Sequence, residues 1–248
     1  MSDSKQSTPN TPALLPEGLK LLADETRWRL ILALRQGDYQ VGELTTQLGL
    51  PQNLVSYHLS ALRQGGLVQI HRSDADGRVI YYSLDFAALK DIYRDLGVRL
   101  CVPNHVPVAR ELSGTIVFLC TANSARSQMA EAWLRHLGQG QYIVRSAGTR
   151  PQPIHPLTSR VMAEVGVDLG SQYAKGLEAL QDLRPDLIIT VCDITREACA
   201  YWGSEVAQIH WSISDPLAAP EGEQEAMFRA VRDALHLRVE GLLASFSE

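Results

Sequence analysis

The segment Thr115–Ser127, TIVFLCTANSARS, decides the fold of the second half of this chain. A short apolar run, Thr115–Leu119, ends at Cys120, small residues follow, and a helical pattern begins at Ser127. A buried strand, a tight loop and a helix in this order form the repeating unit of a parallel α/β sheet. The loop then lies at the carboxyl end of the strand, where the binding sites of such sheets gather.

The loop has the composition of an oxyanion site. Small residues allow successive backbone N–H groups to point inward around a tetrahedral anion, and the following helix presents its positive end. Both effects are expected to lower the pKa of Cys120 and make it a thiolate nucleophile. Arg126 can hold the anion through two parallel hydrogen bonds, and Ser127 can donate to the thiolate. The predicted oxyanion-binding residues are Thr121, Ala122, Asn123, Ser124, Ala125, Arg126 and Ser127.

Strand-like and helix-like stretches alternate from Gly114 onward, which predicts a doubly wound, four-stranded parallel α/β sheet. Asp215, followed by Pro216, comes after the last strand and is the candidate general acid for a leaving oxygen. An Asp-Pro pair alone is usually a turn, so the position at the sheet edge carries this assignment. The expected strands are Thr115–Leu119, Tyr142–Ser146, Asp186–Val191 and Val206–Trp211, and the expected helices are Ser127–Leu137, Pro156–Val165 and Glu223–Phe246.

The segment Cys120–Glu131, CTANSARSQMAE, together with Asp215-Pro216 resembles the low-molecular-weight tyrosine phosphatase superfamily. Its SQMAE ending is similar to the thioredoxin-coupled arsenate reductases. The resemblance covers about residues 114–247. Two more cysteines, Cys192 and Cys199, follow the predicted strand Asp186–Val191, where a phosphatase has no need for thiols and where the similar reductases carry a pair.

This resemblance implies a disulfide relay, because arsenate must gain two electrons to become arsenite. Cys120 attacks arsenate, Cys192 attacks the sulfur of Cys120 as arsenite leaves, and Cys199 then attacks Cys192. An external reductant such as thioredoxin reduces the final disulfide, and no bound cofactor is expected. The loop that carries both cysteines has to move, and the polar sequence Asp193–Glu197 is compatible with a mobile loop.

The similar reductases often bind potassium beside the anion-binding loop. By resemblance, Ala174 and Gly176 stand where a hydroxyl and a carboxylate would be expected, and Lys175 supplies positive charge instead. This argues against a potassium requirement, and no metal site is predicted. Three residues do match part of that site, namely Asn123, Glu131 and Ser146.

The first half of the chain has mostly helical periodicity, followed by a predicted β-hairpin. Helix, short turn, helix and hairpin form the winged helix-turn-helix pattern. Leu22–Leu30, Glu43–Leu50 and Val55–Arg63 resemble ArsR-type repressors, over about residues 16–97. The expected elements are helices through Leu21–Leu34, Glu43–Leu48, Pro51–Arg63 and Asp85–Gly97, and strands Leu67–Ile70 and Arg78–Leu84.

By that resemblance the recognition helix is Gln52–Arg63, and a homodimer pairs through its first and last helices to bind a palindromic DNA operator. The pairing surface is expected to include Phe86, Leu89 and Ile92. Arsenite-sensing members carry a cysteine pair where this chain has Tyr39–Leu44, so inducer sensing is lost, relocated or carried by the second half. The predicted DNA contacts are Gln52, Asn53, Ser56, Tyr57 and His58 for bases and Arg72 and Arg78 for phosphates.

The length of 248 residues is typical of two domains. A net charge of −5 gives no support of its own to nucleic-acid binding. No apolar run approaches the roughly 20 residues of a membrane span, and the polar start lacks the pattern of a signal peptide, so a cytoplasmic location is expected. Four cysteines are too few for a disulfide scaffold, and Cys101 is the only one outside the catalytic half. The predicted boundaries are a disordered tail at 1–15, a winged helix-turn-helix domain at 16–97, a linker at 98–113 and a reductase-like domain at 114–248.

Three functions remain open. The first is an arsenate reductase fused to a DNA-binding or dimerising module. The second is a tyrosine phosphatase, and the third is an oxyanion-responsive transcriptional regulator without turnover. Cys192 and Cys199 favour the reductase over the phosphatase, and Leu217-Ala218 lacks the tyrosine common near this point in tyrosine phosphatases. A full set of catalytic groups favours the reductase over the regulator.

Overall fold

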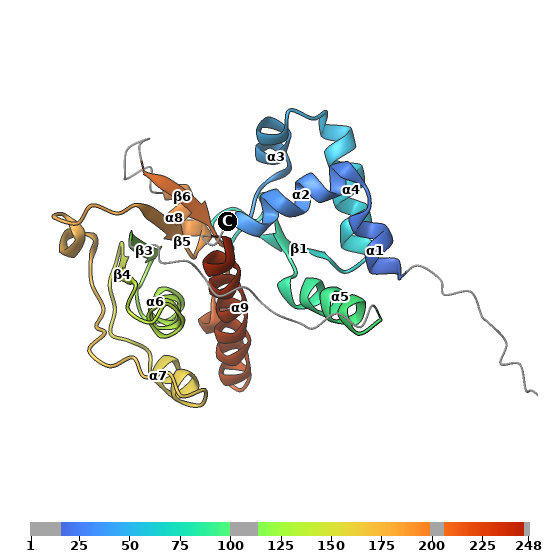
Figure 1. Cartoon of the computed structure of the whole chain (residues 1–248). Coiled ribbons are helices and arrows are strands. Elements are labelled where there is room, and N and C mark those ends of the chain that lie inside the picture. Colours follow the sequence, from blue (N-terminus) through green and yellow to red (C-terminus); the bar gives the residue numbers. More distant parts are fainter. Residues whose placement is uncertain (1–15, 100–113, 199–205, 246–248) are drawn as a thin grey trace, which may run out of the picture.

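The computed structural model describes residues 16–99, 114–198 and 206–245. The predictions made for the tail at 1–15, for Cys101 and most of the linker, and for Cys199 lie outside these residues. Figure 1 shows a helical N-terminal part with a β-hairpin and an α/β C-terminal part, with α9 on the side of the C-terminal part that faces α5.

The N-terminal part is the predicted winged helix-turn-helix. The Asp24 carboxylate accepts a hydrogen bond from the Arg27 N–H and caps α2, while Gly49, with φ of 64°, ends α3 in the left-handed region. The hairpin of β1 and β2, which we call the wing, is antiparallel and pairs Arg72 with Ile80. The elements are α1 (Glu17–Leu22), α2 (Glu25–Gln36), α3 (Val41–Leu48), α4 (Gln52–Gln64), β1 (Val68–Arg72), β2 (Ile80–Leu84) and α5 (Phe86–Arg99).

The C-terminal part is a parallel sheet with the strand order β4-β3-β5-β6, which confirms the predicted doubly wound class. The chain leaves β3 to one side for β4 and returns to its other side for β5, so the order reverses at β3. Ligand sites of such sheets form at this switch point, which is where the loop after Cys120 lies. The elements are β3 (Gly114–Cys120), α6 (Arg126–Leu137), β4 (Tyr142–Gly148), α7 (Pro156–Ala163), η1 (Leu177–Leu180), β5 (Leu187–Thr190), α8 (Asp193–Ala198), β6 (Ala207–His210), η2 (Pro216–Ala218) and α9 (Gln224–Ser245).

The central strand β3 is buried on both of its faces. Phe118 belongs to the main hydrophobic core with side chains of α6, α7 and α9, such as Met129 and Phe228. Val117 points to the other face and packs in a smaller cluster with Ile188. Full burial of each large apolar side chain contributes about 1.5–3 kcal/mol, so β3 is a firm base for Cys120 at its end.

The two parts of the chain meet along β6, α9 and the wing. The Asp38 N–H donates to the His210 carbonyl over 2.7 Å. The Asp38 carboxylate is buried, accepts from the Ser212 N–H (2.6 Å), and pairs with Arg238 of α9 (2.9 Å). Because these are buried hydrogen bonds between segments far apart in sequence, the contact has a defined geometry.

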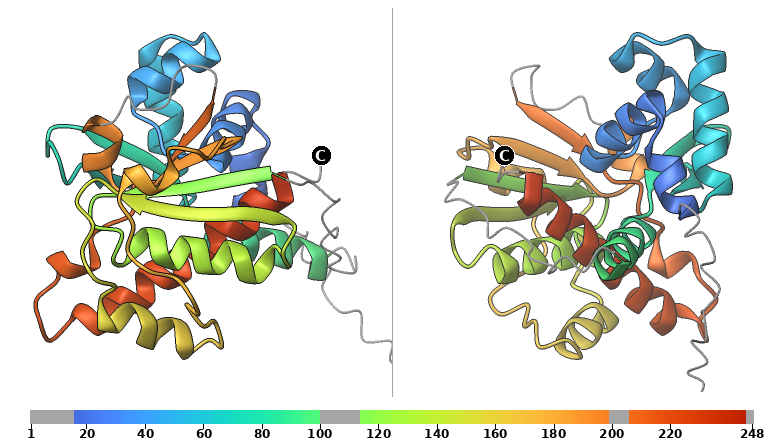
Figure 2. Two further views of the ribbon diagram at one scale, coloured as in Figure 1. Left: turned by 90° about the vertical axis from the view of Figure 1, so that its left-hand side faces the viewer. Right: turned by 45° about the vertical axis from the view of Figure 1, so that its right-hand side comes forward.

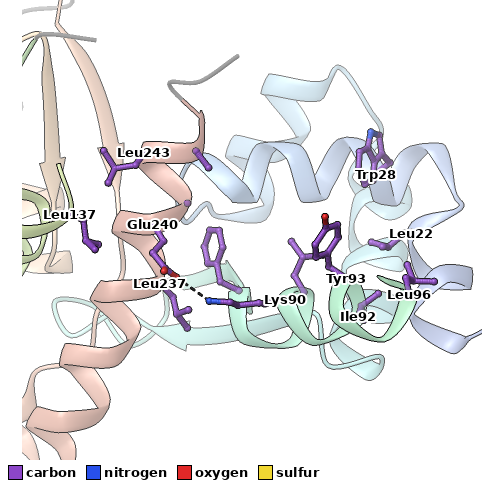
Figure 3. Close-up of a pocket in the computed structure, with 14 residues that line it drawn as sticks. Leu22, Trp28, Lys90, Ile92, Tyr93, Leu96, Leu137, Leu237, Glu240 and Leu243 are labelled. Carbon is purple, nitrogen blue, oxygen red and sulfur yellow. Dashed lines mark hydrogen bonds and ion pairs between the residues drawn. The ribbon is translucent and has the colours of Figure 1, made fainter. Parts of the chain in front are cut away.

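An apolar pocket lies between α5 and α9 (Figure 3). Lys90 of α5 pairs with Glu240 of α9 over 3.4 Å beside it. A Cβ built on Gly241 would come within 2.8 Å of Phe86, so α9 covers part of the surface predicted for dimer pairing. Trp28 and Tyr93 line the pocket and stay about half exposed, and pairing remains a prediction.

No helix among the described residues has both the length and the apolar character needed to cross a membrane.

Candidate active site

The anion loop, Cys120–Ser127, has its carbonyl groups tied to the segment that follows β4. The carbonyls of Thr121 and Ala122 accept hydrogen bonds from the N–H groups of Arg150 (2.8 Å) and Gln152 (2.9 Å). With these carbonyls held outward, N–H groups of the loop are left for the inner side, as an anion nest requires. Gly148 packs directly against the loop, and a larger residue would not fit there, because a Cβ would lie 2.6 Å from the Thr121 carbonyl oxygen.

Asn123 fixes the curvature of the loop. It is fully buried, and its φ of 48° places it in the left-handed region that Asn tolerates better than most residues. Its side-chain oxygen accepts from the Lys175 N–H (2.7 Å) and from Gln128 (2.9 Å). Its side-chain nitrogen donates to the hydroxyls of Ser127 (2.9 Å) and Ser146 (2.7 Å). The Asn123 side chain therefore shapes the loop, and the predicted anion contact of this position through the loop backbone stays a prediction.

Cys120 lies at the base of the loop. Its sulfur is 2.8 Å from the Ser127 hydroxyl and 3.0 Å from the Asn123 N–H. Burial raises the pKa of the Cys120 thiol, with Cys192 as a second contribution, and Ser127 and Arg126 only partly oppose this rise. The direction differs from the lowered pKa expected from the sequence, because desolvation of the buried sulfur outweighs the hydrogen bonds and the charge of Arg126 that favour the thiolate.

Arg126 and Asp215 come together, as the catalytic prediction requires. One Arg126 nitrogen donates to the Ile213 carbonyl (2.8 Å) and another donates to the Asp215 carboxylate (2.9 Å). A second carboxylate, that of Asp74 in the wing, lies 3.6 Å from Arg126. The guanidinium therefore stands between two acids, one from each part of the chain.

Cys192 lies beside the anion loop and is buried. Its sulfur is 3.5 Å from the Thr121 hydroxyl, and its thiol donates to the Thr195 hydroxyl over 3.0 Å. While its mobility stays a prediction, the segment after Cys192, expected to be a polar loop, forms α8 over Asp193–Ala198. The reason is that Asp193 is buried and held by several partners.

Asp193 is a functional candidate that the sequence did not indicate. Its carboxylate accepts from His71 (3.1 Å), the Asp74 N–H (3.0 Å) and Ser212 (2.8 Å), and it lies 3.1 Å from His210. Desolvation raises its pKa, but the hydrogen bonds from His210 and His71 outweigh this and hold the pKa far below the usual range. The same bond raises the pKa of His71. Because Asp193 directly follows Cys192, these contacts join the wing to the segment that carries Cys192.

Two further contacts fix the N-terminal part on α8. The Ser73 hydroxyl at the wing donates to Glu197 over 2.6 Å. Arg196 donates to Glu43 of α3 over 2.6 Å. Both partners of each pair lie more than a hundred residues apart in sequence, so only the folded structure reveals them.

The residues beside the loop do not fit a resident potassium ion. The Lys175 ammonium lies 3.6 Å from the buried Glu131 carboxylate and donates to the Tyr173 carbonyl (2.8 Å). Arg135 also pairs with Glu131, at 2.6 Å. Two side-chain cations therefore already lie beside the one carboxylate, and their charges disfavour a further cation at this place.

The predicted DNA-contact residues of α4 divide into two groups. His58 is buried, and its ring nitrogen lies 3.5 Å from Asp24 at the start of α2, so the prediction that it contacts bases is wrong. It occupies the inner face of α4 because Val55, Leu59 and Leu62 lie on that same face. The exposed group is Gln52, Asn53, Ser56 and Tyr57.

The two arginines predicted to contact phosphates are exposed at the wing. Arg78 pairs with Asp76 over 2.8 Å, and Arg72 donates to the Gly77 carbonyl over 3.0 Å. The other side of the same hairpin, at His71, Ser73 and Asp74, contacts the C-terminal part.

A parallel sheet whose switch-point loop joins a cysteine to an arginine six residues later defines a phosphatase-type oxyanion enzyme. The chain belongs to the low molecular weight phosphotyrosine protein phosphatase family, whose model matches residues 115–248. Residues 24–69 match the bacterial regulatory protein arsR family. The winged helix-turn-helix and the phosphatase fold are thus joined in one chain, as the sequence predicts.

Similar proteins include two described as arsenate reductases. The protein from Halalkalibacterium halodurans is 34% identical over 126 residues, which cover 50% of this chain and 91% of that protein. The protein from Bacillus licheniformis is 38% identical over 128 residues, which cover 50% of this chain and 91% of that protein. A solved structure described as an arsenate reductase in oxidized state is 30% identical, covers 54% of this chain and 99% of its own, and has a TM-score of 0.48.

Proposed function

We propose that this chain reduces arsenate to arsenite, with Cys120 as nucleophile and Cys192 and Cys199 as the relay. The observation that carries the proposal is the Cys192 thiol, buried beside the anion loop and in contact with Thr121. Hydrolysis of a phosphate ester needs no second thiol there, whereas a two-electron reduction does. The similar proteins described as arsenate reductases, which match 50% of this chain, support the same substrate.

In the first step the Cys120 thiolate attacks arsenic while the loop N–H groups and Arg126 bind the oxygens. Asp215 gives a proton to the leaving oxygen, which departs as water, and a sulfur–arsenic bond forms. Arg126 lies at the loop and donates a hydrogen bond to Asp215, so the arginine that binds the anion is adjacent to the general acid. The thiol must first lose its proton, which the raised pKa of Cys120 makes pH-dependent.

In the second step the Cys192 thiolate attacks the sulfur of Cys120. The sulfur–arsenic bond breaks, its electron pair stays on arsenic, and arsenite leaves a Cys120–Cys192 disulfide. Cys199 then attacks Cys192 and frees Cys120 as a thiolate. A thioredoxin-type dithiol reduces the Cys192–Cys199 disulfide, so that two electrons in total pass from the external reductant to arsenic.

The test is a single turnover without external reductant, followed by quantitative thiol titration. Each arsenite formed should consume two thiols, and mass spectrometry should find the disulfide between Cys192 and Cys199. Cys192→Ser should abolish repeated turnover, while Cys101→Ser, the matched control outside the anion loop and relay, should behave as the wild type. Repeated turnover by Cys192→Ser would refute the relay.

For the N-terminal part we propose operator binding by a homodimer. The exposed polar residues of α4 support it, because the first turns of a recognition helix reach base edges. A mobility-shift titration with promoter fragments, with Gln52→Ala and Asn53→Ala against the buried-face control His58→Gln, tests this. Loss of sequence preference is expected for the first two variants. Sequence preference that survives in both would contradict the assignment.

A further inference from the structure

The wing stands at the entrance of the active site. The left view of Figure 2 shows the hairpin reaching the carboxyl end of the sheet beside α8. Its attachment is polar and specific: His71 and the Asp74 N–H bind Asp193, and Ser73 binds Glu197. The Ser73 oxygen also accepts from the N–H groups of Ala75 and Asp76, which fixes the turn itself. The wing tip is therefore held in place by both parts of the chain.

The position of Asp74 relative to the reacting groups shows which side of the anion it flanks. The general acid marks where the leaving oxygen lies, since it must reach that oxygen to protonate it. Asp215 and Asp74 approach different nitrogens of the same guanidinium, at 2.9 Å and 3.6 Å. Desolvation raises the pKa of Asp74, and the nearby charges of Asp193 and Asp215 add to this rise, so the Asp74 carboxylate lies within electrostatic reach of Asp215. Asp74 thus lies on the side of the anion from which the leaving oxygen departs, which we call the leaving side.

The leaving side is where an inorganic oxyanion and a phosphate ester differ. In arsenate the leaving oxygen carries at most a hydrogen, whereas in a phosphotyrosyl or other aryl ester it carries a ring that extends outward. A wall at this position excludes the ring and leaves the small anion unaffected.

We propose that the wing tip, Ser73–Asp74, forms this wall and restricts the site to small inorganic oxyanions, with Asp74 as the specificity-determining residue. The inference rests on the proposed function for the roles of Asp215 and the anion loop. It assigns the selection of substrate to a side chain of the repressor-like part, which the phosphatase family model at residues 115–248 does not include.

The test compares an aryl ester with an inorganic anion in four full-length variants, three point substitutions and one shortened hairpin. The kcat/KM for hydrolysis of p-nitrophenyl phosphate by water is measured together with the Kd of inorganic phosphate. Asp74→Asn keeps the volume and removes the charge, while Asp74→Ala removes both. Asp76→Ala is the matched control, because Asp76 lies in the same turn but pairs with Arg78 in solvent.

Asp74→Asn should improve phosphate binding and ester hydrolysis by the same factor, since it relieves repulsion of any anion. Asp74→Ala should raise ester kcat/KM by about a further tenfold, mainly through a lower KM, with no further change in phosphate Kd. Asp76→Ala should match the wild type. A variant with Asp74–Arg78 replaced by Asn-Gly, a sequence suited to a two-residue hairpin, should hydrolyse the ester at least as well as Asp74→Ala.

Equal changes for ester and phosphate in all variants would overturn the proposal, as would an unchanged ester rate in both Asp74→Ala and the shortened hairpin. The arsenate assay on the wild type is run in parallel. If that assay fails while Asp74→Ala still gains ester hydrolysis alone, the proposed function fails and the steric wall stands.

Discussion

Replacing Asp38 should weaken the contact between the two parts of the chain more than any surface change. Asp38 is 1% exposed and accepts hydrogen bonds from Ser212 and from Arg238, which is 8% exposed. Among the residues that the structure describes, one buried guanidinium nitrogen of Arg238 has no hydrogen-bond partner, so the Asp38 carboxylate is the main compensation for its charge.

Asp38→Ala leaves this buried charge unpaired, which typically costs about 3–5 kcal/mol. The free energy of unfolding should fall by that amount in urea denaturation of the full chain. The double variant Asp38→Ala with Arg238→Met removes both charges and should recover most of the loss, because an apolar pair of similar volume is often as stable as a buried ion pair.

Asp182→Ala, at an exposed position, is the control and should change stability by less than about 0.5 kcal/mol. A loss below about 1 kcal/mol for Asp38→Ala, or a double variant no better than the single one, would refute the reasoning that an unpaired Arg238 is the cause.

Three other predictions follow from the charges around the site. Because the pKa of Cys120 is raised, its alkylation rate should keep rising with pH above 7, and Ser127→Ala should move the rise to higher pH; mass spectrometry of the Cys120 peptide measures both, and a plateau below pH 7 would contradict this. The His71–Asp193 contact, which raises the pKa of His71, stabilises wing docking fully below about pH 6.5, the ordinary histidine value, and this contribution is lost as pH rises through the higher folded value; the protection factors of the wing amides, corrected for the intrinsic pH dependence of exchange, should fall accordingly in the wild type and not in His71→Gln. Lys175→Met should lower the free energy of unfolding by about 1–3 kcal/mol by removing one cation from Glu131, and exchanging sodium for potassium should leave wild-type arsenate kinetics unchanged.

The strand, loop and helix around Cys120 were predictable because their signals are local. An apolar run, small residues and a helix start follow one another within Thr115–Leu137, and the position of Asp215 follows from the rule that sites gather at strand ends. The winged helix-turn-helix was predictable for the same reason, since turns and hairpin strands are short-range features.

The remaining features depend on contacts between distant segments. Asp193 has four polar partners, and two of them come from the wing. Nothing near Asp193 in the sequence indicates these partners, so the polar composition alone predicts a loop where the structure has α8. His58 was misassigned because one polar residue on an otherwise apolar helix face gives no local sign of burial. The raised pKa of Cys120 reflects the depth of burial, which composition does not provide.

The wing contacts α8 and also carries the two arginines predicted to contact DNA phosphates, and this double role has a thermodynamic consequence. His71, Ser73 and Asp74 hold one edge of the hairpin against α8, while Arg72 and Arg78 are exposed on it. If an operator draws the hairpin away from α8, the hydrogen bonds to Asp193 and Glu197 must break. The free energy needed to break them makes operator binding less favourable. A ligand of the active site that strengthens or weakens those hydrogen bonds therefore changes the affinity for the operator by some factor. Operator binding then changes the affinity for that ligand by the same factor.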